Sequence, residues 1–279
     1  MKVSTLLSRL SKVALVLAAG VAPFMSSAPA RADAVLNVAN WTDYIDQKAL
    51  EEFTKETGIR VVYDTYDSNE ILETRLLAGG TGYDIVAPSA TFLQRQIKAG
   101  VFQKLNKALL PNLKGVSGDI SARLAVYDPG NEYSVPYMWF TTGIAYNTAK
   151  IKERLGDKAM DTWDIVFKPE NMKKLADCGV YFLDSPEDIL AIAAKYAGLS
   201  PELRDASGIR RAAEVVSHVR PYVRKFHSSE YINGLANGDI CLAIGWAGDA
   251  FQARTRAREA GGGVDVTYVI PREGTLMSI

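Results

Sequence analysis

The chain has 279 residues, of which 48% are apolar and 23% are charged, and 32 basic side chains balance 32 acidic ones. This apolar content excludes a disordered chain, and the length allows one large α/β domain or two lobes. The lack of a basic excess argues against a nucleic-acid binder, because such a protein needs cationic side chains to neutralise phosphates.

The first 32 residues have the pattern of a cleavable secretory signal peptide. They contain four basic residues and no acidic one, and their apolar run, Val13–Ala22, is too short to span a bilayer. They end in the small-x-small triplet Ala30-Arg31-Ala32. We therefore expect cleavage before Asp33 and export of the chain, which leaves a mature chain of 247 residues with a net charge of −4.

Export also decides how the two cysteines are interpreted. An oxidising compartment favours a disulfide between Cys178 and Cys241, which would close a loop of 64 residues. With only two cysteines and two histidines, a structural zinc site is not expected, and no sequence pattern calls for another metal or a cofactor. The mature chain has no further apolar run of membrane-spanning length, so we expect it not to be inserted in a membrane.

In the first part of the mature chain, short apolar runs alternate with amphipathic segments. Strands are expected at Val35–Ala39, Arg60–Tyr66 and Asp84–Ala87, and helices at Gln47–Thr57, after a capping Asp67, and at Phe92–Ala99. Strands separated by helices of about ten residues predict a parallel βαβαβ sheet with right-handed crossovers.

The second part repeats this alternation after a region rich in turns. Strands are expected at Tyr133–Met138, Gly143–Asn147, Gly179–Leu183, Ile240–Ile244 and Val264–Ile270, and helices at Pro169–Ala176, Glu187–Ala197, Ile209–Val219, Tyr231–Ala236 and Gly248–Ala260. We place the boundary between two lobes near Met138. Residues 33–138 would form lobe 1, residues 139–266 would form lobe 2, and residues 267–279 would return to lobe 1.

Common hydrolase motifs are absent from the sequence. There is no Gly-x-Ser-x-Gly or His-Glu-x-x-His, and the glycine cluster Gly79–Gly82 lacks the Lys-Ser/Thr of a phosphate-binding loop. Acidic residues are plentiful, so an exported hydrolase or transferase that uses a carboxylate pair stays open as an alternative. Turnover that Asp43→Asn abolishes would favour that alternative over simple binding.

Aromatic, hydroxyl and acidic residues gather where four predicted strands end. The four segments are Trp41-Thr42-Asp43-Tyr44, Pro88-Ser89-Ala90-Thr91, Asp184-Ser185-Pro186-Glu187-Asp188 and Gly245-Trp246-Ala247-Gly248-Asp249. Ligands of open α/β sheets bind at the carboxyl ends of strands, and a cleft lined by acids and indole faces suits a cation that is partly aliphatic. Taken singly, a Trp at a strand end is more typical of core packing, and an Asp there is more typical of a helix N-cap; it is their repetition at four strand ends that favours a ligand site.

These segments resemble the polyamine-binding proteins that supply bacterial ABC importers, and the putrescine-binding type most closely. The matching segments are Asn40–Ile45, Asp67–Glu70, Pro88–Leu93, Pro136–Trp139, Phe182–Glu187, Phe226–Ser229, Leu235–Cys241 and Gly245–Asp249. The resemblance implies a type II periplasmic binding protein with two α/β lobes and the ligand cleft between them. It also implies a protein without enzymatic activity, which binds putrescine, or next spermidine, and delivers it to an inner-membrane permease.

The resemblance also implies a role for each residue of the site. Trp41 and Trp246 would sandwich the methylene chain of the ligand, and Tyr44 would extend this aromatic wall. Thr42 and Asp43 would bind one ammonium group, and Asp249 would bind the other. Ser89 would lie near the floor of the cleft, and Asp188 would occupy the position of the family Glu. The family pattern is consistent with a Cys178–Cys241 bridge. Trp163, by contrast, lies in an amphipathic stretch, so we expect Trp246→Ala to weaken polyamine binding more than Trp163→Ala.

Three departures from the family pattern accompany the resemblance. Thr42 is the residue of spermidine binders whereas Asp43 is typical of putrescine binders, and Asp188 is one methylene shorter than the family Glu. Relatives continue beyond the strand at Val264–Ile270 with an aromatic-x-Asp segment and a helical portion. The resemblance therefore predicts a chain truncated at its C-terminus, with a first lobe that lacks its C-terminal portion. A regulatory partner is a further possibility that the sequence leaves open.

Overall fold

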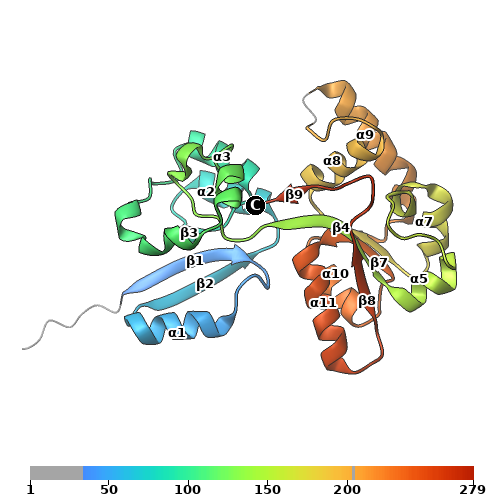
Figure 1. Ribbon diagram of the computed structural model, residues 1–279, viewed down its shortest axis with the longest axis horizontal. Coiled ribbons are helices and arrows are strands. Elements are labelled where there is room, and N and C mark those ends of the chain that lie inside the picture. The colour runs from blue at the N-terminus through green and yellow to red at the C-terminus, as the bar shows by residue number, and fades with distance from the viewer. Residues whose placement is uncertain (1–33, 203–204) are drawn as a thin grey trace, which may run out of the picture.

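The computed structural model describes residues 34–202 and 205–279 (Figure 1). The predicted signal peptide and its cleavage site lie outside these residues. No helix in the described ranges is long and apolar enough to cross a membrane. The same ranges contain no group of three or more His, Cys, Asp or Glu side chains that could hold a metal ion.

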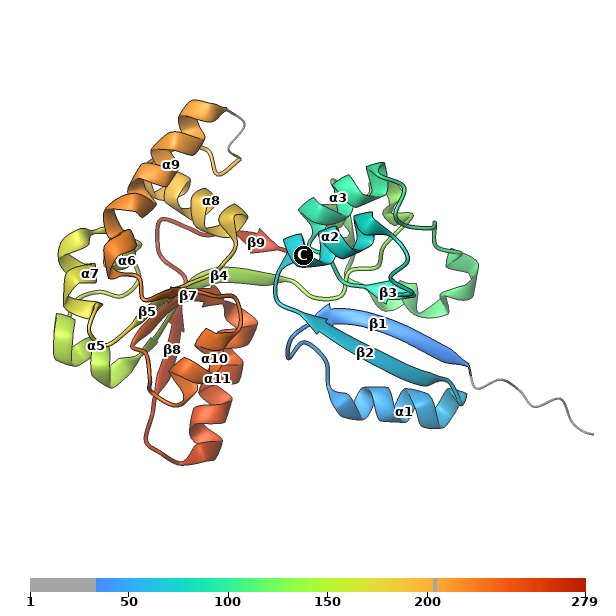
Figure 2. The ribbon, with the colours of Figure 1, turned by 180° about the vertical axis from the view of Figure 1, so that it is seen from behind.

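Two α/β lobes lie next to each other and are connected by β4 and β9, as the two opposite views show (Figures 1 and 2). The first lobe consists of β1 (Val35–Trp41), α1 (Gln47–Thr57), β2 (Arg60–Tyr66), α2 (Asn69–Ala78), β3 (Ile85–Val86), α3 (Ala90–Lys98), α4 (Gly118–Leu124) and the 3-10 turns η1 (Lys107–Leu109), η2 (Pro111–Gly115) and η3 (Pro129–Asn131). The second lobe begins on β4 (Phe140–Asn147), which runs out of the first lobe and into the second sheet.

The second lobe is the larger of the two. Its further elements are α5 (Thr148–Leu155), α6 (Asp164–Phe167), α7 (Pro169–Leu175), β5 (Val180–Phe182), α8 (Pro186–Tyr196), α9 (Ala206–Val219), η4 (Arg220–Tyr222), β6 (Lys225–Phe226), α10 (Glu230–Ala236), β7 (Leu242–Trp246), α11 (Ala247–Ala260), β8 (Val266–Val269) and β9 (Met277–Ser278). Most of the buried apolar side chains of the described residues form one cluster in this lobe.

The sheet of the first lobe is parallel, as the sequence predicts. Its strand order is β2-β1-β3, and β1 pairs with β2 from Val35↔Arg60 to Trp41↔Tyr66. Parallel strands end at a common edge of the sheet, so Trp41, Tyr66 and the segment after β3 emerge on one side of the lobe. This edge faces the second lobe.

The sheet of the second lobe is mixed, with the order β6-β5-β7-β4-β8. Strand β5 is parallel to β6 and β7, whereas β4 is antiparallel to β7 and β8. The central strand β7 is buried along its whole length and ends at Trp246. Since β7 points toward the first lobe, its last residue reaches the junction between the lobes (Figure 2).

Several predicted element boundaries are wrong. The predicted strand Tyr133–Met138 does not form: the backbone N–H groups of Tyr133 and Ser134 bind the carboxylate of Asp128, and Pro136 has no N–H to donate. Strand β7 covers Leu242–Trp246 instead of Ile240–Ile244. All the residues from Ile240 to Trp246 are buried, so their hydropathy does not mark where the strand begins.

The predicted cap of α2 is also wrong by one residue. Ser68, not Asp67, is the N-cap, because its backbone is extended and its hydroxyl oxygen accepts hydrogen bonds from the N–H groups of Glu70 and Ile71. Asp67 does not cap the helix, and it lines a cavity at the junction between the lobes.

The chain passes between the lobes twice, and the two passages are hydrogen-bonded to each other. Strand β9 pairs antiparallel with the start of β4, in the register Thr141↔Met277 and Phe140↔Ser278. The carbonyl oxygen of Ile279 accepts a hydrogen bond of 3.0 Å from the N–H of Ala90, at the start of α3. The assignment of residue ranges to lobe 1 and lobe 2 stays a prediction.

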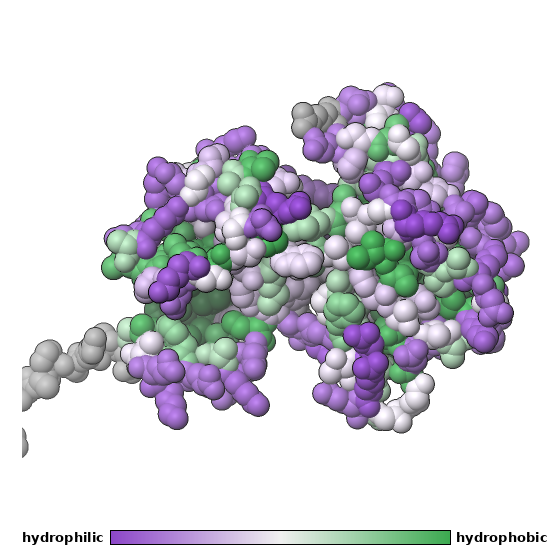
Figure 3. Space-filling model, in the orientation of Figure 1, coloured by the Kyte–Doolittle hydropathy of each residue, from purple (hydrophilic) through white to green (hydrophobic). Residues whose placement is uncertain are grey.

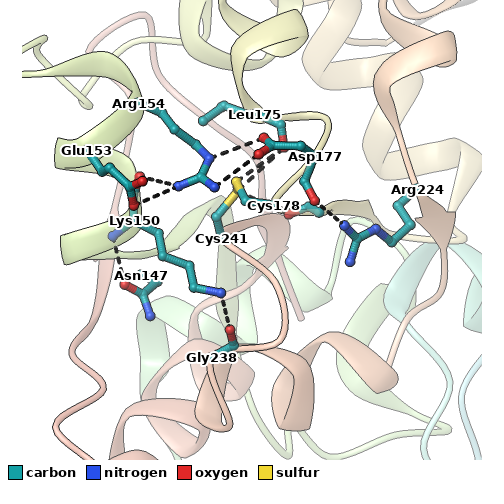
Figure 4. Close-up of a disulfide and its surroundings, with 11 residues drawn as sticks. Asn147, Lys150, Glu153, Arg154, Leu175, Asp177, Cys178, Arg224, Gly238 and Cys241 are labelled. Atoms are coloured by element: carbon teal, nitrogen blue, oxygen red, sulfur yellow. Dashed lines mark hydrogen bonds and ion pairs between the residues drawn. A yellow bond between two sulfur atoms is a disulfide. The ribbon is translucent and has the colours of Figure 1, made fainter.

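The predicted disulfide between Cys178 and Cys241 is present. Both residues are buried, and they lie just before β5 and just before β7, respectively, so the bridge ties two neighbouring strands of the second sheet (Figure 4). The guanidinium group of Arg154 pairs with the carboxylate of the adjacent Asp177 at 3.1 Å. The bridge is therefore part of the scaffold of the second lobe and lies away from the junction between the lobes.

Removing this disulfide is expected to lower the free energy of unfolding by up to about 4 kcal/mol, because the bridge restricts the unfolded chain. Denaturant unfolding of the double variant Cys178→Ala/Cys241→Ala, compared with the oxidised protein, measures the loss. The oxidised protein in reductant should move toward the variant. An unchanged denaturation midpoint in the double variant would show that the bridge contributes nothing to stability.

Candidate functional site

A small cavity of about 10 Å³ lies at the junction between the lobes. Its lining residues come from both lobes: Trp41, Thr42, Tyr44, Asp67, Ser228, Ser229, Trp246 and Asp249. This volume is close to what a single water molecule needs. Two of the lining side chains are carboxylic acids and none of them is a lysine or an arginine, so the cavity favours a positively charged occupant.

Two tryptophans meet beside this cavity. Trp41 ends β1 and donates its indole N–H to the carbonyl oxygen of Ala87 at 2.8 Å, and Trp246 ends β7. Their ring centroids are 5.3 Å apart and the ring planes are at 80°, an edge-to-face contact across the lobe junction. Phe140, at the start of β4, packs against Trp246 at 5.6 Å. The meeting point of the lobes is therefore an aromatic contact built from two strand ends.

Asp249 is the most deeply buried acid of the cavity. It lies in the first turn of α11 with 1% of its surface exposed, and its Oδ2 accepts a hydrogen bond of 2.6 Å from the hydroxyl of Tyr231. Its Oδ1 has no hydrogen-bond partner. Burial raises the pKa of Asp249 to about 7, although the hydroxyls of Tyr231 and Tyr44 oppose the rise.

Four buried polar atoms near the junction between the lobes have no hydrogen-bond partner. They are Asp249 Oδ1, Tyr44 Oη, Ser228 Oγ and Trp246 Nε1. Each such atom costs about 1–3 kcal/mol when it is left without a hydrogen bond in a folded protein. All four belong to residues that line the cavity. These unpartnered groups make the cavity the candidate site for a ligand.

Asp43 takes part in a contact between the lobes outside this cavity. Its carboxylate forms an ion pair of 2.6 Å with the guanidinium group of Arg256, and its carbonyl oxygen accepts a hydrogen bond of 2.9 Å from Gln252. Both partners lie on α11. The backbone of Asp43 has φ of 63°, a value unusual for a residue other than glycine. The turn after β1 is thus held against the second lobe.

Asp188 and Ser89 are also satisfied by neighbours outside the cavity. Asp188 accepts hydrogen bonds from the hydroxyls of Thr142, at 2.9 Å, and Ser185, at 2.8 Å, and burial raises its pKa. Ser89 exchanges two hydrogen bonds with the side-chain amide of Asn69, at 2.9 and 3.0 Å.

The predicted site residues therefore divide into two groups. Trp41, Thr42, Tyr44, Trp246 and Asp249 come together around the cavity, whereas Asp43, Ser89 and Asp188 lie outside its lining. The ligand-binding role of every one of them stays a prediction.

Sequence reasoning missed four residues of this region. Ser228 and Ser229 belong to a segment that matches the family pattern, and that match was their only signal. The sequence predicts Asp67 as a helix cap and Tyr231 as the first residue of a short helix, and neither as part of the site. The role of Tyr231 depends on the placement of α10 beside the end of β7, because its hydroxyl also accepts a hydrogen bond of 2.9 Å from the N–H of Trp246.

A second, much larger hollow of about 1210 Å³ opens in the first lobe. It lies between β1, β3 and the segment 133–140, and its lining is mostly apolar, with Val38, Ile85 and Phe102 among the lining residues. Figure 3 shows the hydrophobic atoms that surround it. Trp41, Tyr44 and Trp246 line both hollows and so lie between the small polar cavity and the large apolar one.

Comparisons with known proteins identify similar chains. A family model described as bacterial extracellular solute-binding protein matches residues 48–279. The chain is 55% identical over 263 residues to a putrescine-binding periplasmic protein of Pseudomonas aeruginosa. This match covers 94% of the present chain and 71% of the relative. It is 51% identical over 243 residues to a putrescine-binding periplasmic protein of Escherichia coli, with coverage of 86% and 66%.

A solved structure is similar as well. A lipoprotein of Treponema pallidum superposes with a TM-score of 0.73 at 30% sequence identity, over 88% of this chain and 73% of that chain. The chain thus spans between 66% and 73% of the length of these three proteins.

Proposed function

We propose, since the chain belongs to the family of bacterial extracellular solute-binding proteins, that it captures a polyamine between its two lobes and delivers it unchanged to an ABC importer of the inner membrane. Putrescine is the first candidate ligand and spermidine the second. Location in the periplasm is part of this proposal. It is supported by the signal-peptide pattern of residues 1–32 and by the periplasmic relatives.

One observation carries the proposal: buried acceptor atoms without partners line a cavity that has acidic groups and no basic ones. An alkylammonium group has three N–H donors and one positive charge. Asp249 Oδ1, Tyr44 Oη and Ser228 Oγ could each accept one of these hydrogen bonds. Because the carboxylate acceptor is charged, that bond would be about twice as strong as a neutral one.

The methylene chain of a polyamine would lie against the indole faces of Trp41 and Trp246. In the present arrangement the two rings touch edge to face, at 5.3 Å between centroids, and leave no space for an alkyl chain. Capture therefore requires the rings to separate, which opening of the lobes about β4 and β9 would allow. When the lobes close again, the chain would replace the contact between the rings, and cation–π attraction would add to its affinity.

Contacts between the lobes would hold the closed form around the ligand. Besides the ion pair between Asp43 and Arg256, the hydroxyl of Thr91 in the first lobe donates a 2.9 Å hydrogen bond to Glu187 in the second. The predicted roles of Thr42, Asp43, Ser89 and Asp188 toward the ligand remain part of the proposal. In particular, Asp43 would have to share its carboxylate between Arg256 and an ammonium group.

Isothermal titration of the purified mature chain with putrescine and with spermidine tests the proposal. We expect saturable binding at one site, with putrescine bound more tightly, and no binding of 1,4-butanediol, which has the same carbon chain without charge. Chromatography of the recovered ligand should show it unchanged, and conversion would favour a hydrolase or transferase instead. A chain that is folded by circular dichroism and gives no heat with either polyamine would overturn the proposal.

A further inference from the structure

We propose that capture of the cationic ligand releases a proton from Asp249, and that the hydrogen bond from Tyr231 lowers the pH at which capture weakens. This inference rests on the proposed function, because it concerns the same cavity. It adds a coupling between ligand binding and the pH of the compartment, and a positioning residue that does not itself line the cavity.

The geometry fixes the direction of the hydrogen bond between Tyr231 and Asp249. The hydroxyl oxygen of Tyr231 accepts a hydrogen bond from the backbone N–H of Trp246 at 2.9 Å, so its single proton is directed to Asp249 Oδ2 at 2.6 Å. Tyr231 is fully buried, and its ring lies so close to Gly245 that a Cβ there would be 2.5 Å from the ring. The donor therefore cannot turn away, and it stabilises the ionised form of the carboxylate.

The second oxygen of Asp249, Oδ1, has no hydrogen-bond partner. The groups around the carboxylate act on its pKa in opposing directions: the hydroxyl of Tyr44 and the guanidinium group of Arg256 favour the ionised form, whereas Asp43 repels its negative charge.

The other residues that line the cavity bring no positive charge close to Asp249. Asp67 also lines the cavity, and no lysine or arginine does so. Burial is the largest effect, and the resulting pKa of about 7 leaves the carboxyl group about half protonated at neutral pH in the absence of a ligand.

A bound ammonium group needs the ionised carboxylate, so the proton has to leave when the ligand binds. The apparent affinity then follows the ionised fraction of Asp249 in the free protein. A pKa near 7 gives binding about tenfold weaker at pH 6 than at pH 8. The direction of this pH dependence follows from the raised pKa of Asp249. The apparent affinity is at its maximum when the pH is above this pKa, and it decreases as the pH falls through it.

Calorimetric titration with putrescine at several pH values between 6 and 8.5 tests the inference. Each titration is run in phosphate and in Tris, whose heats of protonation differ strongly, so that the difference between the two observed heats counts the released protons. At pH 7 we expect about half a proton per bound putrescine, rising toward one at pH 6 and falling toward zero at pH 8.5. The amines of putrescine remain charged over this range and do not contribute.

Two variants separate the role of Tyr231 from general damage. Tyr231→Phe removes the donor that favours the ionised carboxylate, so the pH at which affinity falls should move upward. Tyr196→Phe is the matched control, because it removes a tyrosine hydroxyl that donates a 2.8 Å hydrogen bond to another carboxylate of the second lobe, Asp164. This control should leave the pH midpoint unchanged. Asp249→Asn, which cannot ionise, should release no proton at any pH.

The possible outcomes are distinct. Binding of putrescine with the same affinity at pH 6 and pH 8, and with equal heats in both buffers, would overturn this inference and leave the proposed function intact. No binding even at pH 8.5 would overturn both. Equal midpoints in Tyr231→Phe and Tyr196→Phe would remove Tyr231 from the coupling. If Tyr231→Phe does not fold, the two-buffer measurement on the unaltered protein still decides whether the proton is released.

Discussion

Asp249→Asn should weaken putrescine binding at pH 8 by about 2–5 kcal/mol, which is a loss of about thirtyfold to several thousandfold. Asparagine has nearly the same shape and can still accept the hydrogen bond from Tyr231, so the fold should be preserved. What is lost is the negative charge that would neutralise a buried ammonium group. Calorimetric titration of the variant beside the unaltered protein measures the effect.

The matched control for this experiment is Asp184→Asn. Asp184 also follows a strand of the second sheet, β5, but its side chain is exposed. Its charge should therefore be screened by water, and the variant should bind putrescine within about twofold of the unaltered protein. If Asp249→Asn bound as well as Asp184→Asn, the ammonium group would not lie at Asp249.

Substitution of Trp163 and of Trp246 should affect different properties of the protein. Trp163 is fully buried, packs against Phe167 at 6.0 Å and donates its indole N–H to the carbonyl oxygen of Gly274 at 2.9 Å. Trp163→Ala should lower the free energy of unfolding by about 3–5 kcal/mol, and the protein that remains folded should bind putrescine normally. Trp246→Ala should reduce the affinity for putrescine at least about tenfold, because it removes one aromatic wall of the cleft.

Affinity per folded molecule distinguishes the two substitutions. Denaturant unfolding gives the folded fraction of each variant, and titration of that fraction gives its dissociation constant. Equal losses of affinity in Trp163→Ala and Trp246→Ala would mean that the ligand site has been placed wrongly.

Much of the fold follows from local patterns in the sequence. The first sheet could be predicted because β1 and β2 have apolar runs of the right length and are separated by an amphipathic helix. The disulfide could be predicted because an exported chain with two cysteines leaves only one pairing. The segment Tyr133–Met138 could not be assigned correctly, since its N–H groups bind Asp128, and no local pattern distinguishes that bond from a strand contact.

The candidate site could be predicted only where its residues follow strands. Trp41 and Trp246 end β1 and β7, and Asp249 lies three residues after β7, so the rule for strand ends finds all three. The partner of Asp43 lies 213 positions away in the sequence, at Arg256. Tyr231 reads as an ordinary helix residue until α10 is placed beside β7. Interactions that depend on the packing of distant elements have no signature in a single sequence.

The pairing of β9 with β4 constrains how the two lobes can move. Two separate connections could twist and shear independently, whereas two strands joined by backbone hydrogen bonds behave as one ribbon. Such a ribbon bends more easily across its faces than within its own plane, so we expect the proposed opening of the lobes to follow a single angle. Each closure then brings Trp41 and Trp246 together from the same direction. The search for the closed form becomes nearly one-dimensional, and the direction in which the aromatic walls approach a ligand is set by the ribbon.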